Sequence, residues 1–173
     1  MIKIVNDFFD DKKEFNDLVN YIKKNISFTP RFFVDSKENT KESFYGQRFV
    51  LNSDKDLLDT FISQSEKKFN FKIKKVSDDC GIDLRNLDRF LPHIDSQREG
   101  MGGKLNVLVM LDGPIGVTTG TVFYTDGQLD IHVGFRPNRA ILFPSNYYHS
   151  SHKCELKGIR RYTSTLFIQD YEE

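Results

Sequence analysis

The sequence predicts an α+β domain in which two N-terminal helices precede a series of short β-strands. Two segments within the first 70 residues carry apolar side chains at helical spacing. Beyond residue 100, short apolar runs alternate with turn residues. Regular short strands of this kind indicate a sandwich or jelly roll, with the two helices packed on one outer face. The whole chain, 1–173, has the size of a single domain.

The two expected helices begin after capping residues. Asp11 and Glu14 stand at the spacing of a capping box, and Asp54 stands near the start of a second helix over 54–67. Each helix has one apolar face, formed in the first by Phe15, Leu18, Val19 and Ile22 and in the second by Leu57, Leu58, Phe61 and Ile62. Short strands are expected in MIKIV at the N-terminus and, between the helices, at 44–52.

After the second helix the apolar period becomes twofold, because Phe69, Phe71 and Ile73 alternate with polar residues. This basic, aromatic run has two interpretations: a stripe that binds nucleic acid, or a strand with phenylalanines in the core and lysines in water. The alternation alone accounts for the pattern, so we predict a strand. The chain has 25 basic and 25 acidic residues, and this balance favours neither nucleic acid nor a membrane surface as a partner.

Turn sequences separate the strands of the C-terminal half. DGP, DG and RPN each follow an apolar run and are typical of turns. The strands are expected at 104–112, 121–126, 129–135, 139–145 and 160–168.

The sequence predicts a cytoplasmic chain. Cys80 and Cys154 are isolated and form no pair motif, which favours reduced thiols. The N-terminus is charged by residue 3 and lacks the apolar stretch of a signal peptide. No run approaches the roughly 20 apolar residues of a membrane span.

The segment HIDSQREG holds the first two candidate metal ligands. Side chains alternate along an extended segment, so His93 and Asp95 lie on one face. The third ligand would come from FPSNYYHSSH, as His149 or His152. Two histidines and one carboxylate with open coordination positions suit non-haem Fe(II).

A basic residue on the last predicted strand complements this site. Arg161, Thr163 and Thr165 share one face of that strand. A guanidinium beside hydroxyl groups receives a carboxylate well, because its planar fork can bind both oxygens. A dicarboxylate that chelated the metal at one end would therefore neutralise a buried Arg161 at the other.

The order of HxD, TTGTVFY, NRAILFPS, a histidine and RYTSTLF resembles the Fe(II)/2-oxoglutarate-dependent dioxygenase superfamily, in particular its prolyl-hydroxylase-like branch. The resemblance implies a double-stranded β-helix (jelly roll) core, with His93, Asp95 and His149 as the catalytic iron ligands. It also implies that Arg161, helped by Thr163, binds the far carboxylate of 2-oxoglutarate, the co-substrate consumed with O2. The implied reaction hydroxylates a C–H bond of a peptide, protein or small molecule, with a prolyl or other amino-acid residue as the first candidate.

The chain departs from the family pattern in three places. The gap from His149 to Arg161 is two residues longer than is common, whereas His152 would shorten it; Ser145, four residues before His149, favours His149 as the ligand. TGT at 119–121 replaces the usual GGT. Many relatives carry a tyrosine that contacts 2-oxoglutarate on the strand after HxD, but VLVMLD offers no hydroxyl, so one contact with the co-substrate is unassigned.

Two alternatives from other classes remain. A non-catalytic jelly-roll protein with a binding or structural role could keep the fold, although it would need neither the three ligands nor the arginine. A zinc hydrolase also uses three ligands and a water, but it gives no role to Arg161. Outside the ligand set, we expect His132 to be structural or to face the substrate, and the glycine-rich 98–104 to form a flap beside the metal.

Overall fold

The computed structural model describes residues 1–34, 42–86, 92–97, 103–151 and 160–173. The helices are α1 (Lys12–Asn25) and α2 (Lys55–Phe69). The strands are β1 (Lys3–Val5), β2 (Thr29–Val34), β3 (Glu42–Val50), β4 (Lys72–Val76), β5 (Gly81–Asn86), β6 (Leu105–Asp112), β7 (Gly116–Thr125), β8 (Gln128–Phe135), β9 (Arg139–Pro144), β10 (His149–Ser151) and β11 (Arg160–Glu172). Two short 3-10 turns, η1 (Leu51–Ser53) and η2 (Asp95–Gln97), complete the described elements.

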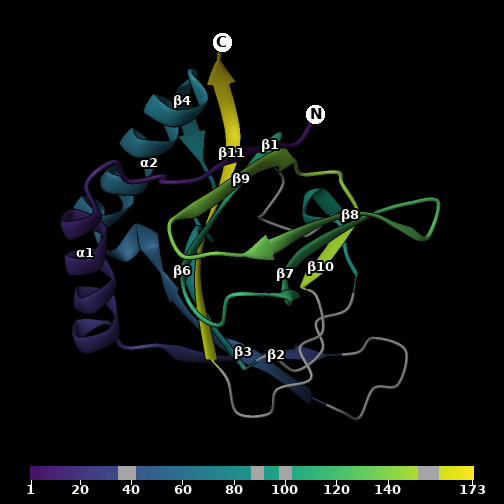
Figure 1. Ribbon diagram of the computed structural model, residues 1–173, viewed down its shortest axis with the longest axis horizontal. Helices are drawn as coiled ribbons and strands as arrows, with labels where there is room; N and C mark the ends of the chain where they lie inside the picture. The colour runs from purple at the N-terminus through teal and green to yellow at the C-terminus, as the bar shows by residue number, and fades with distance from the viewer. Residues whose placement is uncertain (35–41, 87–91, 98–102, 152–159) are drawn as a thin grey trace.

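The strands form two antiparallel sheets. The larger has the order β1-β9-β6-β11-β5-β3-β2, and β4 pairs with the C-terminal part of β11. The smaller has the order β10-β7-β8. The small sheet lies to one side of the large sheet, and α1 and α2 lie to the other (Figure 1). This mostly antiparallel β architecture with two helices is the jelly-roll type that the sequence predicted.

Alternation of side chains along the central strands separates a core from a cavity. Val107 and Val109 of β6 and Leu166 of β11 are fully buried in the same apolar cluster as Phe61 of α2. The opposite face of β11 carries a series of polar residues, because successive side chains point to opposite faces of a sheet. These residues line the cavity described below.

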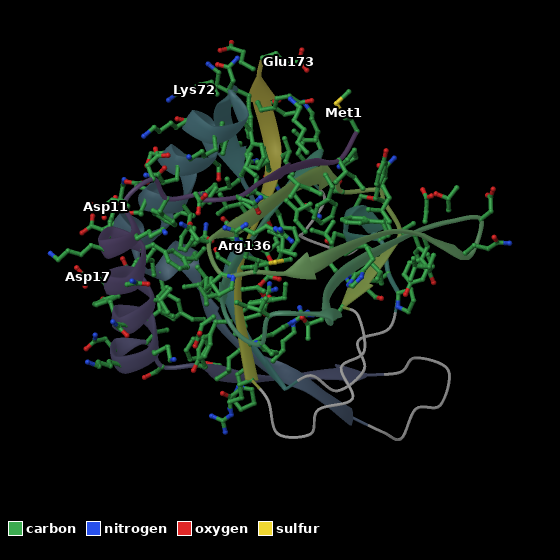
Figure 2. All side chains as sticks on the ribbon, viewed as in Figure 1. Met1, Asp11, Asp17, Lys72, Arg136 and Glu173 are labelled. Carbon is green, nitrogen blue, oxygen red and sulfur yellow. The ribbon has the colours of Figure 1, made fainter. Side chains whose placement is uncertain are left out.

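Both helices begin at the capping residues that the sequence indicated. The Asp11 side chain accepts hydrogen bonds from the backbone N–H of Lys13 at 2.7 Å and of Glu14 at 3.4 Å. Asp54 accepts one from the N–H of Leu57 at 3.1 Å. Figure 2 shows Asp11 at the start of α1, with Asp17 further along on the side that faces away from the sheets. Such caps satisfy donors that the first helical turn leaves unpaired.

The prediction that Phe69 opens a strand is wrong. The structure continues α2 to Phe69 and ends it at Asn70, whose φ of 57° is left-handed. Asparagine tolerates this conformation, so one residue redirects the chain from helix to strand. Phe69 is still buried, and β4 begins at Lys72. The two periodicities overlap at this point, which is why the pattern misplaced the boundary.

Three strands, β2, β5 and β10, were not predicted. β5 is the most consequential, because it lies between β11 and β3 in the large sheet. Its apolar residues Ile82 and Leu84 are buried, but so is Asp83. The alternation of apolar and polar side chains in β5 spans only 82–85, at the lower limit of the roughly four to eight residues from which alternation predicts a strand. Neither described helix has the length and apolar character needed to cross a membrane.

Candidate metal centre

The backbone brings His93 and His149 together although they are far apart in the sequence. His93 N–H donates to the carbonyl of His149 at 2.9 Å, and His149 N–H donates to the carbonyl of His93 at 3.0 Å. The two imidazole ring centroids lie 4.5 Å apart. β10 therefore places His149 beside the HxD segment by a reciprocal backbone pair.

Asp95, the first residue of η2, completes a group of three side chains. Its Oδ1 lies 3.2 Å from Nε2 of His93, and its Oδ2 lies 3.3 Å from Nε2 of His149. One ligand atom from each residue lies within 4.8 Å of the other two, so the group could hold a metal ion. Burial opposes ionisation of Asp95, but hydrogen bonds from His149 and His93 outweigh it and hold the pKa of Asp95 well below its usual range.

The orientation of His149 suits coordination. Its Nδ1 lies 2.9 Å from the carbonyl oxygen of Tyr147. A carbonyl can only accept, so Nδ1 donates this hydrogen bond, and Nε2 is the ring nitrogen that faces Asp95. In the neutral imidazole that nitrogen would have its lone pair available for a metal. A hydrogen bond that fixes the tautomer of a ligating histidine is a common feature of metal sites.

Asn106 of β6 is a contact that sequence reasoning missed. It is fully buried, and its Nδ2 donates to Oδ2 of Asp95 at 2.7 Å. Its Oδ1 has no hydrogen-bond partner within the described part of the chain. The available signal was a lone amide among the apolar residues of LNVLVMLD. The Asn106 amide holds one carboxylate oxygen of Asp95 and thereby orients the other.

We expect Asn106→Ala to weaken the binding of a divalent metal by about 10- to 100-fold, the range typical of residues that orient a ligand. The alanine removes the donor to Asp95 and leaves that carboxylate free to rotate. Titration with Co(II), followed by its visible absorption, measures the affinity. Asn25→Ala is the matched control, since Asn25 lies exposed on α1. Equal Co(II) affinity in Asn106→Ala and the unaltered protein would contradict the assigned role.

A small cavity of about 50 Å³ adjoins these residues and is lined by strands of both sheets. Arg161 of β11 lies in its wall and is buried. One terminal nitrogen, Nη1, donates to the carbonyl of Gly120 in β7 at 3.0 Å, and the other contacts the hydroxyl of Ser151 in β10. Thr163 also lines the cavity and is buried. The predicted ligands and the predicted arginine therefore share one cavity.

A buried ion pair, also not predicted, lines the same cavity. Arg48 of β3 contacts both oxygens of Asp83 at 2.9 Å, and its Nη1 lies 3.1 Å from Asp79 Oδ2. Burial raises the pKa of Asp83, but the charges of Arg48 and Arg85 outweigh this effect and lower it to about 2. Arg48 packs over Gly81, where an added Cβ would lie 2.8 Å from its Cδ.

Of the remaining predicted residues, the structure describes His132 and the TGT sequence but not His152 or most of the glycine-rich segment. Nε2 of His132 lies 2.9 Å from the carbonyl of Thr119, and His132 is not among the residues that line the cavity. Gly120, within the TGT sequence, has a φ of 122°, and a Cβ there would lie 2.1 Å from the carbonyl oxygen of Val133. His152 and most of the glycine-rich 98–104 lie outside the described residues.

Comparisons by sequence gave no result: no protein-family model matches the chain, and neither does any curated protein at a significant level. Comparison with solved structures gave clear matches. A prolyl hydroxylase from Trichoplax adhaerens, in complex with a peptide fragment of the hypoxia inducible factor oxygen degradation domain, is 18% identical with a TM-score of 0.63. The match covers 98% of this chain and 83% of that chain.

Two further solved structures also match this chain. An oxidoreductase of the 2OG-Fe(II) oxygenase family from Burkholderia pseudomallei is 14% identical with a TM-score of 0.65, covering 99% of this chain and 84% of that chain. The epimerase SnoN, in complex with Fe3+, alpha ketoglutarate and nogalamycin RO, is 10% identical with a TM-score of 0.61, covering 97% and 78%. Identities this low show the fold alone. This chain has the fold of the prolyl hydroxylases and other 2-oxoglutarate/Fe(II) oxygenases, as the order of its motifs indicated.

Proposed function

We propose that this protein is an Fe(II)- and 2-oxoglutarate-dependent oxygenase that hydroxylates a C–H bond. The observation that carries the proposal is a single cavity with His93, Asp95 and His149 on its wall together with the buried guanidinium of Arg161. A metal site alone would fit several enzyme classes. A metal site that shares its cavity with a buried arginine fits a co-substrate that has two acidic ends.

The donor set suits ferrous iron. Two imidazole nitrogens and one carboxylate oxygen form the three-ligand arrangement that leaves coordination positions open in non-haem Fe(II) oxygenases. The hydrogen bond from Nδ1 of His149 to the carbonyl of Tyr147 leaves Nε2 as the atom for coordination, and the low pKa of Asp95 keeps its carboxylate ionised, as binding requires. His93, Asp95 and His149 would therefore hold Fe(II).

Arg161 would bind the far carboxylate of 2-oxoglutarate, with the Thr163 hydroxyl beside it. When bound, iron and 2-oxoglutarate supply oxidation by O2: one oxygen atom enters the substrate C–H bond, and the other enters succinate as CO2 is lost. The chain itself would orient the co-substrate and exclude water. Phe143, Phe167 and Leu108 give the cavity apolar walls for that purpose.

The proposed substrate is a prolyl or other amino-acid residue of a peptide or protein. The peptide bound to the Trichoplax prolyl hydroxylase supports this class, because that protein shares the fold over nearly the whole of this chain. The nogalamycin compound bound to SnoN shows that the same fold also receives a small molecule. A screen should therefore include peptides, free amino acids and small molecules.

The charge-transfer band of an Fe(II)–2-oxoglutarate chelate tests the proposal. Under anaerobic conditions, we expect Fe(II) and 2-oxoglutarate to give this weak visible band, and His93→Ala to abolish it. His132→Ala is the matched control, because His132 is a histidine outside the cavity lining. In air, the unaltered protein should release succinate, and a substrate should gain the mass of one oxygen atom.

Two results would reject the proposal. A band that persists in His93→Ala would mean that the metal binds elsewhere. Absence of both the band and succinate from the unaltered protein would favour the non-catalytic jelly-roll alternative.

A further inference from the structure

We infer that the hydroxyl of Thr121 binds the far carboxylate of the co-substrate and supplies the contact for which the strand after HxD offers no hydroxyl. Thr121 belongs to β7 of the small sheet, whereas Arg161 belongs to β11 of the large sheet, so that carboxylate is held from both sheets. The inference rests on the proposed function, which brings a dicarboxylate to Arg161.

The register of the small sheet places Thr121 beside Ser151. The two residues are direct partners across the antiparallel pair of β7 and β10. Directly opposed residues point to the same face of a sheet, with Cβ atoms about 5 Å apart. His149 stands two residues before Ser151 on β10 and therefore shares this face, and all three residues line the cavity. The face that carries a candidate metal ligand thus also carries two hydroxyl groups.

The guanidinium of Arg161 ends at this pair of hydroxyl residues. Its Nη1 donates to the carbonyl of Gly120, the residue before Thr121, at 3.0 Å. Its other terminal nitrogen contacts the hydroxyl of Ser151, the cross-strand partner of Thr121. These two contacts hold the guanidinium against β7 and β10. A carboxylate that meets the guanidinium there lies within reach of the side chain at position 121.

The Thr121 hydroxyl is a buried polar group that has no hydrogen-bond partner within the described part of the chain. Thr121 is only 3% exposed and lines the cavity. The hydroxyl of Ser150, which also lines the cavity, is instead paired with that of Tyr124 at 2.9 Å. Burying a hydroxyl without a partner is costly, so a ligand that accepts its hydrogen bond removes this cost.

A carboxylate can use more donors than one guanidinium provides. Its two oxygens accept up to about four hydrogen bonds, and the planar fork of a guanidinium supplies about two of them. Thr163 of β11 also lines the cavity and adds a hydroxyl from the large sheet. Thr121 adds one from the small sheet. Arg161, Thr163 and Thr121 together match the acceptors of one carboxylate.

Thr165, another buried threonine of the cavity wall, is placed differently. It follows Arg161 by four residues, which span about 13 Å of extended strand. It stands two residues before Phe167, the partner of Asn106 in the register of β11 and β6. Asn106 binds Asp95, so Thr165 lies toward the metal ligands. Thr121 lies at the end of the cavity that holds the guanidinium.

A comparison of two 2-oxoacids tests the inference. 2-Oxoglutarate and 2-oxopentanoate have the same five-carbon chain, but the second lacks the far carboxylate. Thr121→Val removes the hydroxyl and keeps the branched side chain. We expect it to weaken 2-oxoglutarate binding by about tenfold or more, the effect of losing one hydrogen bond to a charged group. The affinity for 2-oxopentanoate should change less than about twofold. Anaerobic titration of the Fe(II) protein measures both affinities through the charge-transfer band.

A second readout does not depend on the band. The rise in melting temperature that 2-oxoglutarate causes in the Zn(II)-loaded protein should be smaller in Thr121→Val, because ligand binding stabilises the folded state. Thr125→Val is the matched control, since Thr125 is exposed on the same strand. Thr121→Ser keeps the hydroxyl and should restore most of the affinity for 2-oxoglutarate. Thr121→Ala replaces the valine variant if valine prevents folding.

The outcomes separate the two proposals. Unchanged 2-oxoglutarate affinity in Thr121→Val, or an equal loss for both 2-oxoacids, would overturn the role of Thr121 and leave the proposed function intact. If the unaltered protein formed no chelate, or if Arg161→Gln kept full affinity for 2-oxoglutarate, the proposed function itself would fail and the inference with it.

Discussion

We expect Asp95→Asn to weaken divalent metal binding by more than about 100-fold, beyond the effect of losing a residue that only orients a ligand. Asp95 is the one carboxylate of the three-residue group, and its oxygens lie 3.2 and 3.3 Å from the two histidines. Asparagine has the same shape and still accepts the hydrogen bond from Asn106, so the fold should persist while the charge is lost. Isothermal titration with Co(II) or Zn(II) measures the affinity.

The control for Asp95→Asn is Asp130→Asn, because Asp130 is an exposed aspartate on β8. Its metal affinity should equal that of the unaltered protein. A parallel loss in both variants would mean that the titration reports surface binding. Near-complete retention of affinity in Asp95→Asn would remove Asp95 from the ligand set.

The second large effect concerns stability. Arg48→Met should lower the free energy of unfolding by about 3–5 kcal/mol, the usual consequence of removing one partner from a buried ion pair. The change deprives Asp83 of two contacts at 2.9 Å in a place where its side chain is only 3% exposed. Urea unfolding at neutral pH measures the difference. In the double variant Arg48→Met with Asp83→Leu, much of the lost stability should return, because the deeply buried carboxylate of Asp83 is no longer left without Arg48.

The pH dependence of unfolding checks the same pair. The pKa of Asp83 falls from 3.8 to about 2 on folding, so its ionisation stabilises the folded state above about pH 4. This contribution, about 2 kcal/mol, is lost as the pH falls from about 4 to 2. Without Arg48 the folded pKa should rise, and this acid sensitivity should diminish. A change in stability below about 1 kcal/mol in Arg48→Met would contradict the importance of the pair.

The parts of the fold that the sequence predicted are those with one apolar and one solvated side. Helix α1 exposes Asp17 and buries Phe15, and its cap at Asp11 is a local contact that spacing alone reveals. The three candidate ligands were also recognisable, because HxD and the later histidine occur in a characteristic order. Their proximity depends on long-range pairing of His93 with His149, which the sequence implied only through a resemblance.

The parts that it did not predict lie where polar residues face inward. β5 has a buried carboxylate at Asp83 where an amphipathic strand would have a solvated side chain. Asn106 is one amide in an apolar strand, and its contact with Asp95 depends on the fold. Sequence periodicity reports contact with water, so it cannot reveal a polar cavity enclosed between two sheets.

The reciprocal backbone pairing of His93 with His149 affects how the proposed centre would bind and release a metal ion. Two candidate ligands joined through their main chains should stay adjacent whether or not an ion is bound, so the entropy of bringing them together is lost once, during chain folding, and not again at each binding event. A chelator should thus strip the ion without unravelling the strands. The metal-free protein would remain folded and able to bind metal again. Metal binding would then control the proposed activity reversibly, without being required for folding.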